Sequence, residues 1–358
     1  MGSFLPLCLS VVLAIAETNG LFFESKVCYD GVGCFHANHP FDNSFGELPD
    51  SPEDMEVRTF LWTRQNPVEA QELKYQDIAS IQDSNFDASR QTKVLIHGFM
   101  SSKDTSPVIA NLSVAFLKQG DYNVIGVDWS KGAKKLYPKA VANTRLVGAV
   151  VAQLIKVLLG KFEMDVKTLH VIGHSLGAHT AGYVGTRIPG IPRITGLDPA
   201  GPLFTKTDPA VHLDPSDALF VDAIHSDGAP IEDAGFGTLS QLGHMDFYPN
   251  GGQIQPGCPP PVKTTVEQLL TFQFTKAFDS VSCAHDRAIW YFIESVLNTN
   301  CQFTSYPCSS WESFKAGNCT TCGDAGCPVM GINSYTRPIK GAFYLQTNSQ
   351  TPFCRKFY

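Results

Sequence analysis

Short apolar runs alternate with a longer periodic segment through the middle of the chain. Between residues 140 and 162, apolar side chains recur at the spacing of a helix, at Val147, Val151, Leu154, Ile155 and Leu158. Four short runs are almost wholly apolar, as expected of strands buried on both faces of a sheet: VLIH (94–97), VIGVD (124–128), LHVIG (169–173) and ITGL (194–197). This alternation, from about Arg58 to Asp227, predicts a mostly parallel sheet with helices on both faces.

The pattern changes after Asp227. Glycine and proline become frequent, and the stretch from Cys301 onward reads as irregular and rich in cysteine. Residues 266–281 stand apart, because apolar side chains at helical spacing alternate there with polar ones. This predicts a strongly amphipathic helix, and a helix of that kind most often lies on a protein core.

The N-terminus has the features of a secretory signal peptide. Leu5 to Ala16 is a short apolar run that ends in the small-x-small triplet Ala14-Ile15-Ala16. It is too short for a membrane span, which needs about 20 apolar residues. We therefore predict a signal peptide over residues 1–20 and an extracellular protein without a transmembrane anchor; the alternative is a buried N-terminal helix.

The cysteines agree with export. The chain has 11 cysteines, and setting aside Cys8 in the predicted signal peptide leaves an even number. In an oxidising compartment, clustered cysteines of this kind are usually disulfides. We predict the pairs Cys28–Cys34, Cys258–Cys283, Cys308–Cys319 and Cys322–Cys327, and the sequence leaves the pairing of Cys301 and Cys354 open. The alternative is a zinc site at Cys319-x-x-Cys322, but no second CxxC or close histidine pair follows it.

Composition excludes other classes of function. Hydrophobic residues make up 43% of the chain and charged residues 17%, which is enough to bury a large core. The net charge is −7 and no basic stripe is present, so nucleic acid is not an expected partner. In a secreted protein, Asn111-Leu-Ser and Asn318-Cys-Thr are candidate N-glycosylation sites.

One short motif carries the candidate chemistry. Gly173-His-Ser175-Leu-Gly177 fits the pattern G-x-S-x-G, with a predicted strand before it and small, helix-tolerant residues after it. In such a nucleophile elbow, the serine occupies a strained turn and the glycines remove side chains that would clash with it. The context therefore favours Ser175 as a nucleophile over a surface hydroxyl in an ordinary turn.

A serine nucleophile needs a histidine base and an orienting carboxylate, and in this architecture they follow in the order acid, then histidine. Asp198 comes directly after the ITGL strand, at the end where such sheets carry function. Asp222 and Asp227 remain alternatives for the acid. For the base, order alone admits His225, His244 and His285, and His285 ranks level with His225.

Longer motifs resemble those of the pancreatic lipase family of secreted animal lipases. They are GHSLGAH, RITGLDPAGPLF, HLDPSDALFVD, DAIHSDGAP and HMDFYPNGGQIQPGC, and the likeness runs from Val27 to about Phe343. The resemblance implies an α/β-hydrolase fold with Ser175 as nucleophile, Asp198 as acid and His285 as base. It also implies an oxyanion hole formed by the backbone N–H groups of Phe99 and Leu176.

Two further features follow from this resemblance. The loop 258–283, closed by its cysteines, corresponds to the family's lid, which covers the site in water and opens at a lipid surface. The turn around HLDPSDALFVD corresponds to a structural calcium site, with the Asp214 and Asp217 carboxylates and the carbonyls of Pro209 and His212 as ligands. On the residues alone, a solvated turn with aspartate caps is the simpler interpretation.

We therefore predict an α/β-hydrolase lipase domain over residues 21–345 and a short tail over 346–358, where the family's β-sandwich domain would begin. Without that domain, the cofactor protein colipase is not an expected partner. The predicted activity is hydrolysis of lipid carboxylic esters at the lipid–water interface, with triacylglycerols as substrate. The alternatives are a phospholipase A1 or galactolipase with the same machinery, and a non-catalytic lipid-binding relative.

Overall fold

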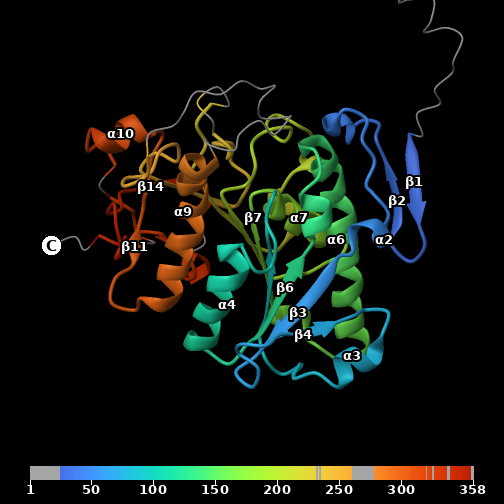
Figure 1. The fold of residues 1–358 in the computed structure, drawn as a ribbon. Helices are drawn as coiled ribbons and strands as arrows, with labels where there is room; N and C mark the ends of the chain where they lie inside the picture. The colour runs from blue at the N-terminus through green and yellow to red at the C-terminus, as the bar shows by residue number, and fades with distance from the viewer. Residues whose placement is uncertain are drawn as a thin grey trace, which may run out of the picture.

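The computed structural model describes residues 25–230, 233, 235–259, 278–319, 321–324, 326–336 and 339–355. The predicted signal peptide lies outside these residues, as does most of the predicted lid with its amphipathic helix. A ten-stranded sheet runs through the described part (Figure 1). Its order is β12 (Tyr306–Pro307), β14 (Gly341–Leu345), β10 (Met245–Pro249), β9 (Val221–Ile224), β8 (Arg193–Leu197), β7 (Leu169–His174), β5 (Thr92–Ile96), β6 (Asn123–Asp128), β3 (Arg58–Trp62) and β4 (Gln71–Leu73).

The centre of this sheet is parallel, as the sequence predicts. β6, β5, β7, β8, β9, β10 and β14 pair in parallel, whereas β3, β4 and β12 join antiparallel at the two edges. The four predicted apolar runs correspond to β5, β6, β7 and β8, each within two residues of its expected bounds. The prediction of a mostly parallel α/β sheet is confirmed, and the arrangement is that of the α/β-hydrolase fold.

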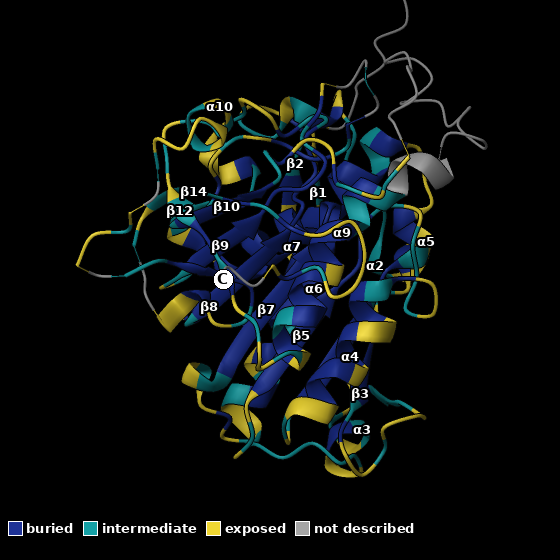
Figure 2. Ribbon diagram, turned by 90° about the vertical axis from the view of Figure 1, so that its left-hand side faces the viewer, coloured by how far each residue is buried: buried dark blue, intermediate teal, exposed yellow. Residues whose placement is uncertain are grey.

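Successive residues of the central strands serve two separate cores. In β5, Val94 and Ile96 face one core while Leu95 faces the other. Helices α6 (Tyr137–Lys161) and α7 (Leu176–Gly185) pack on the first face, and α4 (Pro107–Gln119) and α9 (Phe278–Leu297) pack on the second. Because both faces are covered, the strands have no polar side, which explains their continuous apolar sequence. Figure 2 shows the buried ribbon concentrated in the sheet and in the inner sides of these helices.

Helix α6 is the predicted helix at 140–162, with its first turn at Tyr137. Among the described helices it alone is long and apolar enough to cross a membrane. However, 83% of its most apolar window is buried inside the protein, where it packs against α7. Its length is therefore accounted for by core packing.

Smaller elements complete the described part. The remaining helices are α2 (Pro52–Met55), α3 (Ile78–Gln82), α5 (Ser130–Ala133) and α10 (Trp311–Lys315), with 3-10 turns η1 (Asp42–Ser44), η2 (Val166–Thr168), η3 (Pro209–Val211), η4 (Pro215–Asp217) and η6 (Ser334–Thr336). Two small antiparallel sheets pair β1 (Lys26–Tyr29) with β2 (Gly33–His36), and β11 (Phe303–Thr304) with β13 (Val329–Met330). The region after Cys301, expected to be irregular, thus contains short strands and a helix.

Five disulfides cross-link these peripheral elements in the described part of the chain. They are the four expected pairs, Cys28–Cys34, Cys258–Cys283, Cys308–Cys319 and Cys322–Cys327, together with Cys301–Cys354. The last bond ties the C-terminal segment to the end of α9. The Glu294 carboxylate of α9 strengthens this attachment by accepting the backbone N–H groups of Phe353 and Cys354 at 2.7 and 2.8 Å. This cysteine arrangement provides no zinc site at Cys319 and Cys322.

Candidate active site

Ser175 lies at the turn between β7 and α7, in the conformation of a nucleophile elbow. Its φ is +57°, a left-handed value that is uncommon for a residue with a side chain. The turn is tight because the two glycines of the motif lie against neighbouring backbone. A Cβ on Gly173 would lie 2.0 Å from Gly177 O, and one on Gly177 would lie 2.3 Å from Ile96 O. The glycines are therefore required for the chain to hold Ser175 above the end of the sheet.

Asp198 and His285 come together beside this turn from separate parts of the chain. Asp198 directly follows β8. The backbone N–H of Ser175 donates to the carbonyl of Leu197, the residue before Asp198, at 3.1 Å. His285 lies on α9, and its Nδ1 donates to Asp198 Oδ2 at 2.6 Å. The His285 ring also lies 4.5 Å from that of His174, the residue before the serine.

The Asp198 carboxylate is fully buried and held on both oxygens. Its Oδ1 accepts the backbone N–H groups of Ser226 and Asp227 at 2.6 and 3.0 Å, while Oδ2 accepts from His285. The sequence did not reveal the two backbone donors, because they follow the neighbouring strand β9. They fix the carboxylate so that it orients the imidazole.

Opposing effects of burial and of a neighbouring carboxylate set the pKa of His285. Burial lowers the pKa of His285, but the hydrogen bond to Asp198 and the negative charge of that carboxylate outweigh it, so the net pKa is raised above the ordinary 6.5. Among the described residues, Ser175 Oγ has no hydrogen-bond partner. Catalytic hydrogen bonds are often long or poorly aligned without substrate and tighten only in the reacting complex.

The other two candidate acids accept hydrogen bonds from groups other than His285. Asp222 accepts two hydrogen bonds from the Arg193 guanidinium, at 2.9 and 2.8 Å, and so forms a buried structural ion pair. Asp227 lies near Asp198 and His285, but its Oδ2 accepts the backbone N–H of Phe236 at 3.1 Å. Burial, followed by the charge of Asp198, raises the pKa of Asp227 well above its ordinary value. Geometry therefore singles out Asp198 as the partner of His285.

The rival base His225 has neither ring nitrogen available. Its Nε2 bonds to Asp246 Oδ1 at 2.8 Å and its Nδ1 to the Thr238 carbonyl at 2.6 Å. Its ring is fully buried and stacks on Tyr248, with 4.6 Å between the ring centroids. His244 is also engaged, since its Nδ1 accepts the backbone N–H of Val221 at 3.0 Å.

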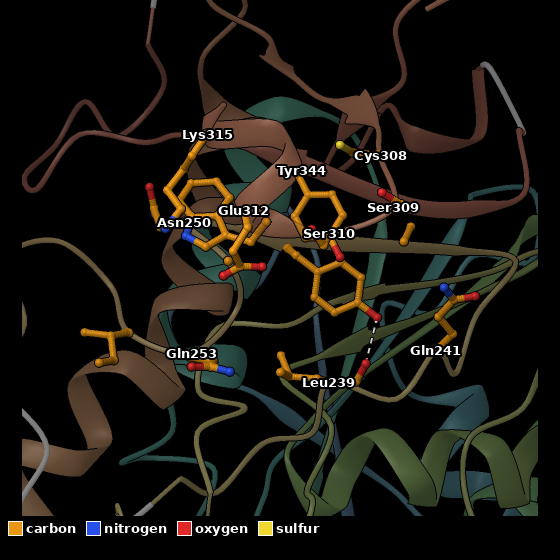
Figure 3. A pocket seen from close by; sticks show the side chains of 15 residues that line it. Leu239, Gln241, Asn250, Gln253, Cys308, Ser309, Ser310, Glu312, Lys315 and Tyr344 are labelled. Atoms are coloured by element: carbon orange, nitrogen blue, oxygen red, sulfur yellow. Dashed lines mark hydrogen bonds between the residues drawn. The ribbon is translucent and has the colours of Figure 1, made fainter. Parts of the chain in front are cut away.

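Tyr248 separates His225 from a surface groove of about 670 Å³ that Figure 3 shows. The Tyr248 hydroxyl donates to the Leu239 carbonyl at 3.0 Å, and its ring stacks on Tyr344 at 5.2 Å. None of the residues lining this groove belongs to the Ser175, Asp198 and His285 group. His225 thus packs behind a stack of aromatic rings, which is a structural role.

The expected oxyanion-hole residues lie on either side of Ser175. Leu176 is the first residue of α7, so its N–H is among those that have no acceptor within the helix. The loop from His97 to Phe99 passes directly beside the serine, because a Cβ on Gly98 would lie 2.6 Å from Ser175 Cβ. His97 anchors this loop: its Nδ1 bonds to the Gly98 carbonyl at 2.8 Å and its ring stacks on Trp129.

His179, a residue that the sequence did not single out, joins the site to the predicted calcium turn. Its Nε2 bonds to the Ala200 carbonyl at 2.9 Å, and its Nδ1 accepts the backbone N–H of Leu213 at 3.1 Å. Because Ala200 follows Asp198 closely, α7 thereby braces the segment that carries the acid. The only sequence signal was its place four residues after Ser175.

In the predicted calcium turn, Asp214 and Asp217 form a capping box around η4. Asp214 Oδ1 accepts the N–H of Ser216, and Asp217 Oδ2 accepts the N–H of Asp214 at 2.8 Å. Burial and the nearby Asp214 charge raise the pKa of Asp217 to about 7. Pro209 lies in η3 and His212 directly after it, so all four predicted ligands lie within nine residues of chain.

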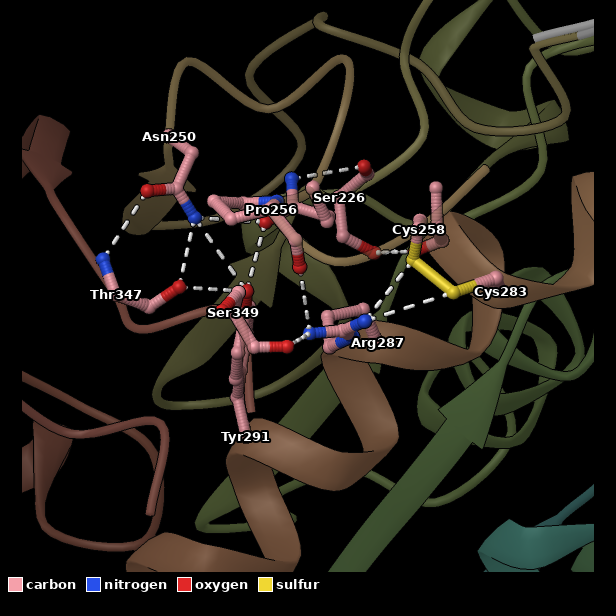
Figure 4. The surroundings of a disulfide bond; sticks show 11 residues. Ser226, Asn250, Pro256, Cys258, Cys283, Arg287, Tyr291, Thr347 and Ser349 are labelled. Carbon is pink, nitrogen blue, oxygen red and sulfur yellow. Dashed lines mark hydrogen bonds between the residues drawn. A yellow bond between two sulfur atoms is a disulfide. The ribbon is translucent and has the colours of Figure 1, made fainter. Parts of the chain in front are cut away.

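The predicted lid begins and ends in described residues, at the Cys258–Cys283 disulfide. Arg287, one turn beyond Cys283 on α9, contacts both sulfur atoms through Nη2, and its Nη1 donates to the carbonyls of Pro256 and Ser349 (Figure 4). Arg287 therefore links the disulfide, α9 and the C-terminal segment to one another at the two ends of the predicted lid. Cys283 lies two residues before His285 in the chain. Residues 260–277, which include most of the predicted amphipathic helix, lie outside the described part.

Both glycosylation candidates are exposed. Asn111 lies on the outer side of α4, and Asn318 follows α10.

Comparison with known proteins identifies relatives over nearly the whole chain. A sequence model of the family described as Lipase matches residues 25–353. The chain is 41% identical over 347 residues to inactive pancreatic lipase-related protein 1 of Mus musculus, which covers 93% of this chain and 72% of that protein. It is 42% identical over 354 residues to human pancreatic lipase-related protein 3, covering 94% and 74%. It is 40% identical over 352 residues to pancreatic triacylglycerol lipase of Myocastor coypus, covering 95% and 76%.

Proposed function

The chain belongs to the lipase family, and from that premise we propose that it is a secreted serine lipase hydrolysing carboxylic esters of lipids, with triacylglycerols as its substrate class. The observation that carries the proposal is the 2.6 Å hydrogen bond between His285 and Asp198 beside a serine in the elbow conformation. A nucleophile, a base and an orienting acid on three separate elements are what acyl transfer requires.

In the proposed reaction, each of these residues has a step. Ser175 Oγ attacks the ester carbonyl carbon, and His285 Nε2 takes the hydroxyl proton while Asp198 holds Nδ1–H and stabilises the imidazolium. The N–H groups of Leu176 and Phe99 donate to the carbonyl oxygen as it becomes an anion. His285 then returns the proton to the departing alcohol. Water, deprotonated by His285, then attacks the acyl-enzyme, and His285 returns that proton to Ser175 Oγ as the fatty acid is released.

Exposed apolar side chains near the site fit a substrate held at a lipid surface. Met100 follows the oxyanion loop and is 41% exposed, and its N–H bonds to the Ala133 carbonyl at 3.1 Å. Leu136, three residues beyond Ala133, is 62% exposed. Such side chains are costly to expose to water and gain free energy in contact with lipid.

A non-catalytic lipid-binding protein is the second candidate, because a relative at 41% identity bears the word inactive in its name. The two functions separate in one experiment on the purified protein. Fatty-acid release is measured from a triacylglycerol emulsion, a phospholipid and a galactolipid, with Ser175→Ala as the control. Our proposal expects release to be fastest from the triacylglycerol. Preference for a polar lipid would correct the substrate class, and no release from any lipid would favour the binding protein.

The activity should depend on pH through His285. Only the neutral imidazole can accept the proton of Ser175, so activity is lost as pH falls through the pKa of His285. Because that pKa is raised above 6.5, we expect the acid limb of kcat/KM to lie above pH 6.5. The measurement is kcat/KM against pH with a soluble short-chain ester at constant ionic strength. His39→Gln, a change on an exposed loop, should leave the limb in place; a limb below 6.5 in the wild type would contradict His285 as the base.

We propose a structural calcium ion at the turn that carries Asp214 and Asp217, with the carbonyls of Pro209 and His212 completing an oxygen ligand set. The buried carboxyl of Asp217, with its raised pKa, fits such an ion, because a nearby divalent cation would favour the ionised form. Bound there, calcium would supply stability, since a ligand specific for the native state shifts the unfolding equilibrium.

Calcium should therefore raise the thermal midpoint, and the double change Asp214→Asn with Asp217→Asn should remove that rise. With chelator, stability should fall as pH rises from about 4 to about 7, because native Asp217 keeps a proton that the unfolded chain has released. Asp165→Asn, which removes an aspartate cap at η2, is the matched control and should keep the response to calcium. Identical melting curves with calcium and with chelator at equal ionic strength would rule the ion out.

A further inference from the structure

A second pocket lies at the edge of the sheet opposite Ser175, where the parallel strands begin. It has a volume of about 430 Å³, which is within the range of small-molecule sites. Lys93 near the start of β5, His170 near the start of β7 and Arg193 at the start of β8 line it. The far ends of α4 and α9 close it, through Gln119 and Val296. No step of the proposed hydrolysis uses this pocket.

Lys93 is the unusual group in this pocket, because it is a buried cation with little to balance it. Its side chain belongs to a residue that is only 6% exposed. Its Nζ donates to Gln91 Oε1 at 3.0 Å, the one hydrogen bond that it makes among the described residues. The rings of Tyr122 and Phe116 lie 5.0 and 5.7 Å from the ammonium. Burial, with the positive charge of Arg193, lowers the pKa of Lys93 to about 8.

The buried carboxylate beside Arg193 is already committed to other partners. Asp222 forms a two-point ion pair with Arg193 and also accepts from Thr195 and Ser334. Arg193 is further saturated by the carbonyls of Gly331 and Ile332. Burial lowers the pKa of His170 well below its ordinary value, so that ring is neutral. The exposed Lys167 adds another positive charge at the rim, so the pocket carries net positive charge in a chain of net charge −7.

The rest of the lining combines polar and apolar side chains. Leu169, Pro192, Val296 and Ile332 contribute aliphatic surface, and the rings of Tyr122 and Tyr335 lie at the wall. A hydrated inorganic ion would leave this surface unused. An amphiphilic anion would contact both the positive charge and the apolar surface of the pocket.

We propose that this pocket binds an organic anion, with a carboxylate or phosphate head against Lys93 and an aliphatic part along Leu169, Val296 and Ile332. A charge-assisted hydrogen bond from the ammonium to the oxyanion is strong where water is excluded. The bound head would also supply the counter-charge that the described residues around Lys93 do not provide, and so offset the penalty of burying its charge.

The experiment is calorimetric titration of the purified protein with octanoate and with octyl phosphate, at constant ionic strength. We expect at least one ligand to bind, and the tighter of the two identifies the head group. Lys93→Met, which keeps the volume and removes the charge, should weaken that binding about ten- to a hundredfold. Lys93→Arg should retain it. Lys315→Met, which removes another cation lying over an aromatic ring, is the matched control and should bind as the wild type does.

Without ligand, Lys93→Met should melt at a higher temperature than the wild type, because a buried unpaired charge has been removed. A measurement on the wild type alone gives a further check: either ligand that binds should slow acetylation of Lys93 and leave that of Lys315 unchanged, as quantified by mass spectrometry. Failure of both ligands to bind, binding unchanged in Lys93→Met, or unprotected Lys93 would each overturn the proposal.

Discussion

Replacing Ser175 with alanine is expected to lower turnover of every ester substrate about 10⁶-fold while the protein stays folded. The loss is large because the serine oxygen is the atom that forms the acyl-enzyme, and His285 and Asp198 have nothing to activate without it. What remains would come from the oxyanion donors and substrate binding. The measurement is kcat on a soluble ester and on emulsified triacylglycerol, beside a thermal melt of the same sample.

The backbone conformation at residue 175 allows the effect of the hydroxyl to be separated from an effect on folding. Alanine has a Cβ like serine, so the left-handed backbone at φ +57° is no more strained in the variant. Ser175→Gly is a useful companion, since it should relax that strain and be at least as stable while remaining inactive. Residual turnover above about one per cent of wild type in Ser175→Ala would place the nucleophile elsewhere.

The second large effect separates the two histidines that the sequence left level. His285→Ala should lower turnover about 10⁶-fold, because triad members act as a unit. His225→Ala should keep turnover within a few-fold of wild type at temperatures where it is folded. It should instead lower stability, by about 1–3 kcal/mol for a buried polar partner left unsatisfied, here Asp246 or the Thr238 carbonyl.

These two variants are each other's control, since both remove an imidazole that is hydrogen-bonded to an aspartate. A folded but inactive His225→Ala, together with an active His285→Ala, would reverse the assignment of the base. Loss of activity in both, with His225→Ala still native by its melting curve, would also contradict the structural role given to His225.

The sequence predicted the centre of the fold because the evidence for it is local. Strands β5 to β8 are buried on both faces, so their central residues are mostly apolar, and α6 repeats at helical spacing. The elbow could be recognised because a tight turn needs Gly173 and Gly177 within a few residues of the serine. In contrast, the pairing of β10 with β14 joins residues nearly a hundred positions apart, and nothing in either short strand specifies its partner.

Choices among similar residues in the site depended on contacts that a linear sequence does not contain. Each of the three candidate acids, Asp198, Asp222 and Asp227, lies in a strand or shortly after one, so position along the chain does not distinguish them. Arg193 takes Asp222, and the N–H groups of residues 226 and 227 hold Asp198. Likewise, His225 and His285 differ in whether their ring nitrogens are already bonded. Only family resemblance, which carries such contacts implicitly, favoured His285 before the structure did.

The surroundings of Lys93 also depend on contacts that the sequence does not contain. In sequence, Lys93 is one polar residue at the start of an apolar run, as expected of a strand end in water. Its burial arises because α4 and α9 close over that end, and among the described residues it forms no ion pair, whereas Arg193 pairs with Asp222. Neither fact can be read from the neighbours of Lys93 along the chain.

The central claim is that Ser175 is an activated nucleophile, and covalent labelling tests it most directly. A phosphonate ester with a 4-nitrophenolate leaving group reports each event, because the attacking oxygen bonds to phosphorus and expels one nitrophenolate. The measurement is the amount of nitrophenolate released per protein chain, with mass spectrometry to locate the adduct. Our account predicts one equivalent released and the adduct on Ser175, with neither seen in His285→Ala over the same time. An unlabelled wild-type protein, or an adduct on another residue, would contradict it.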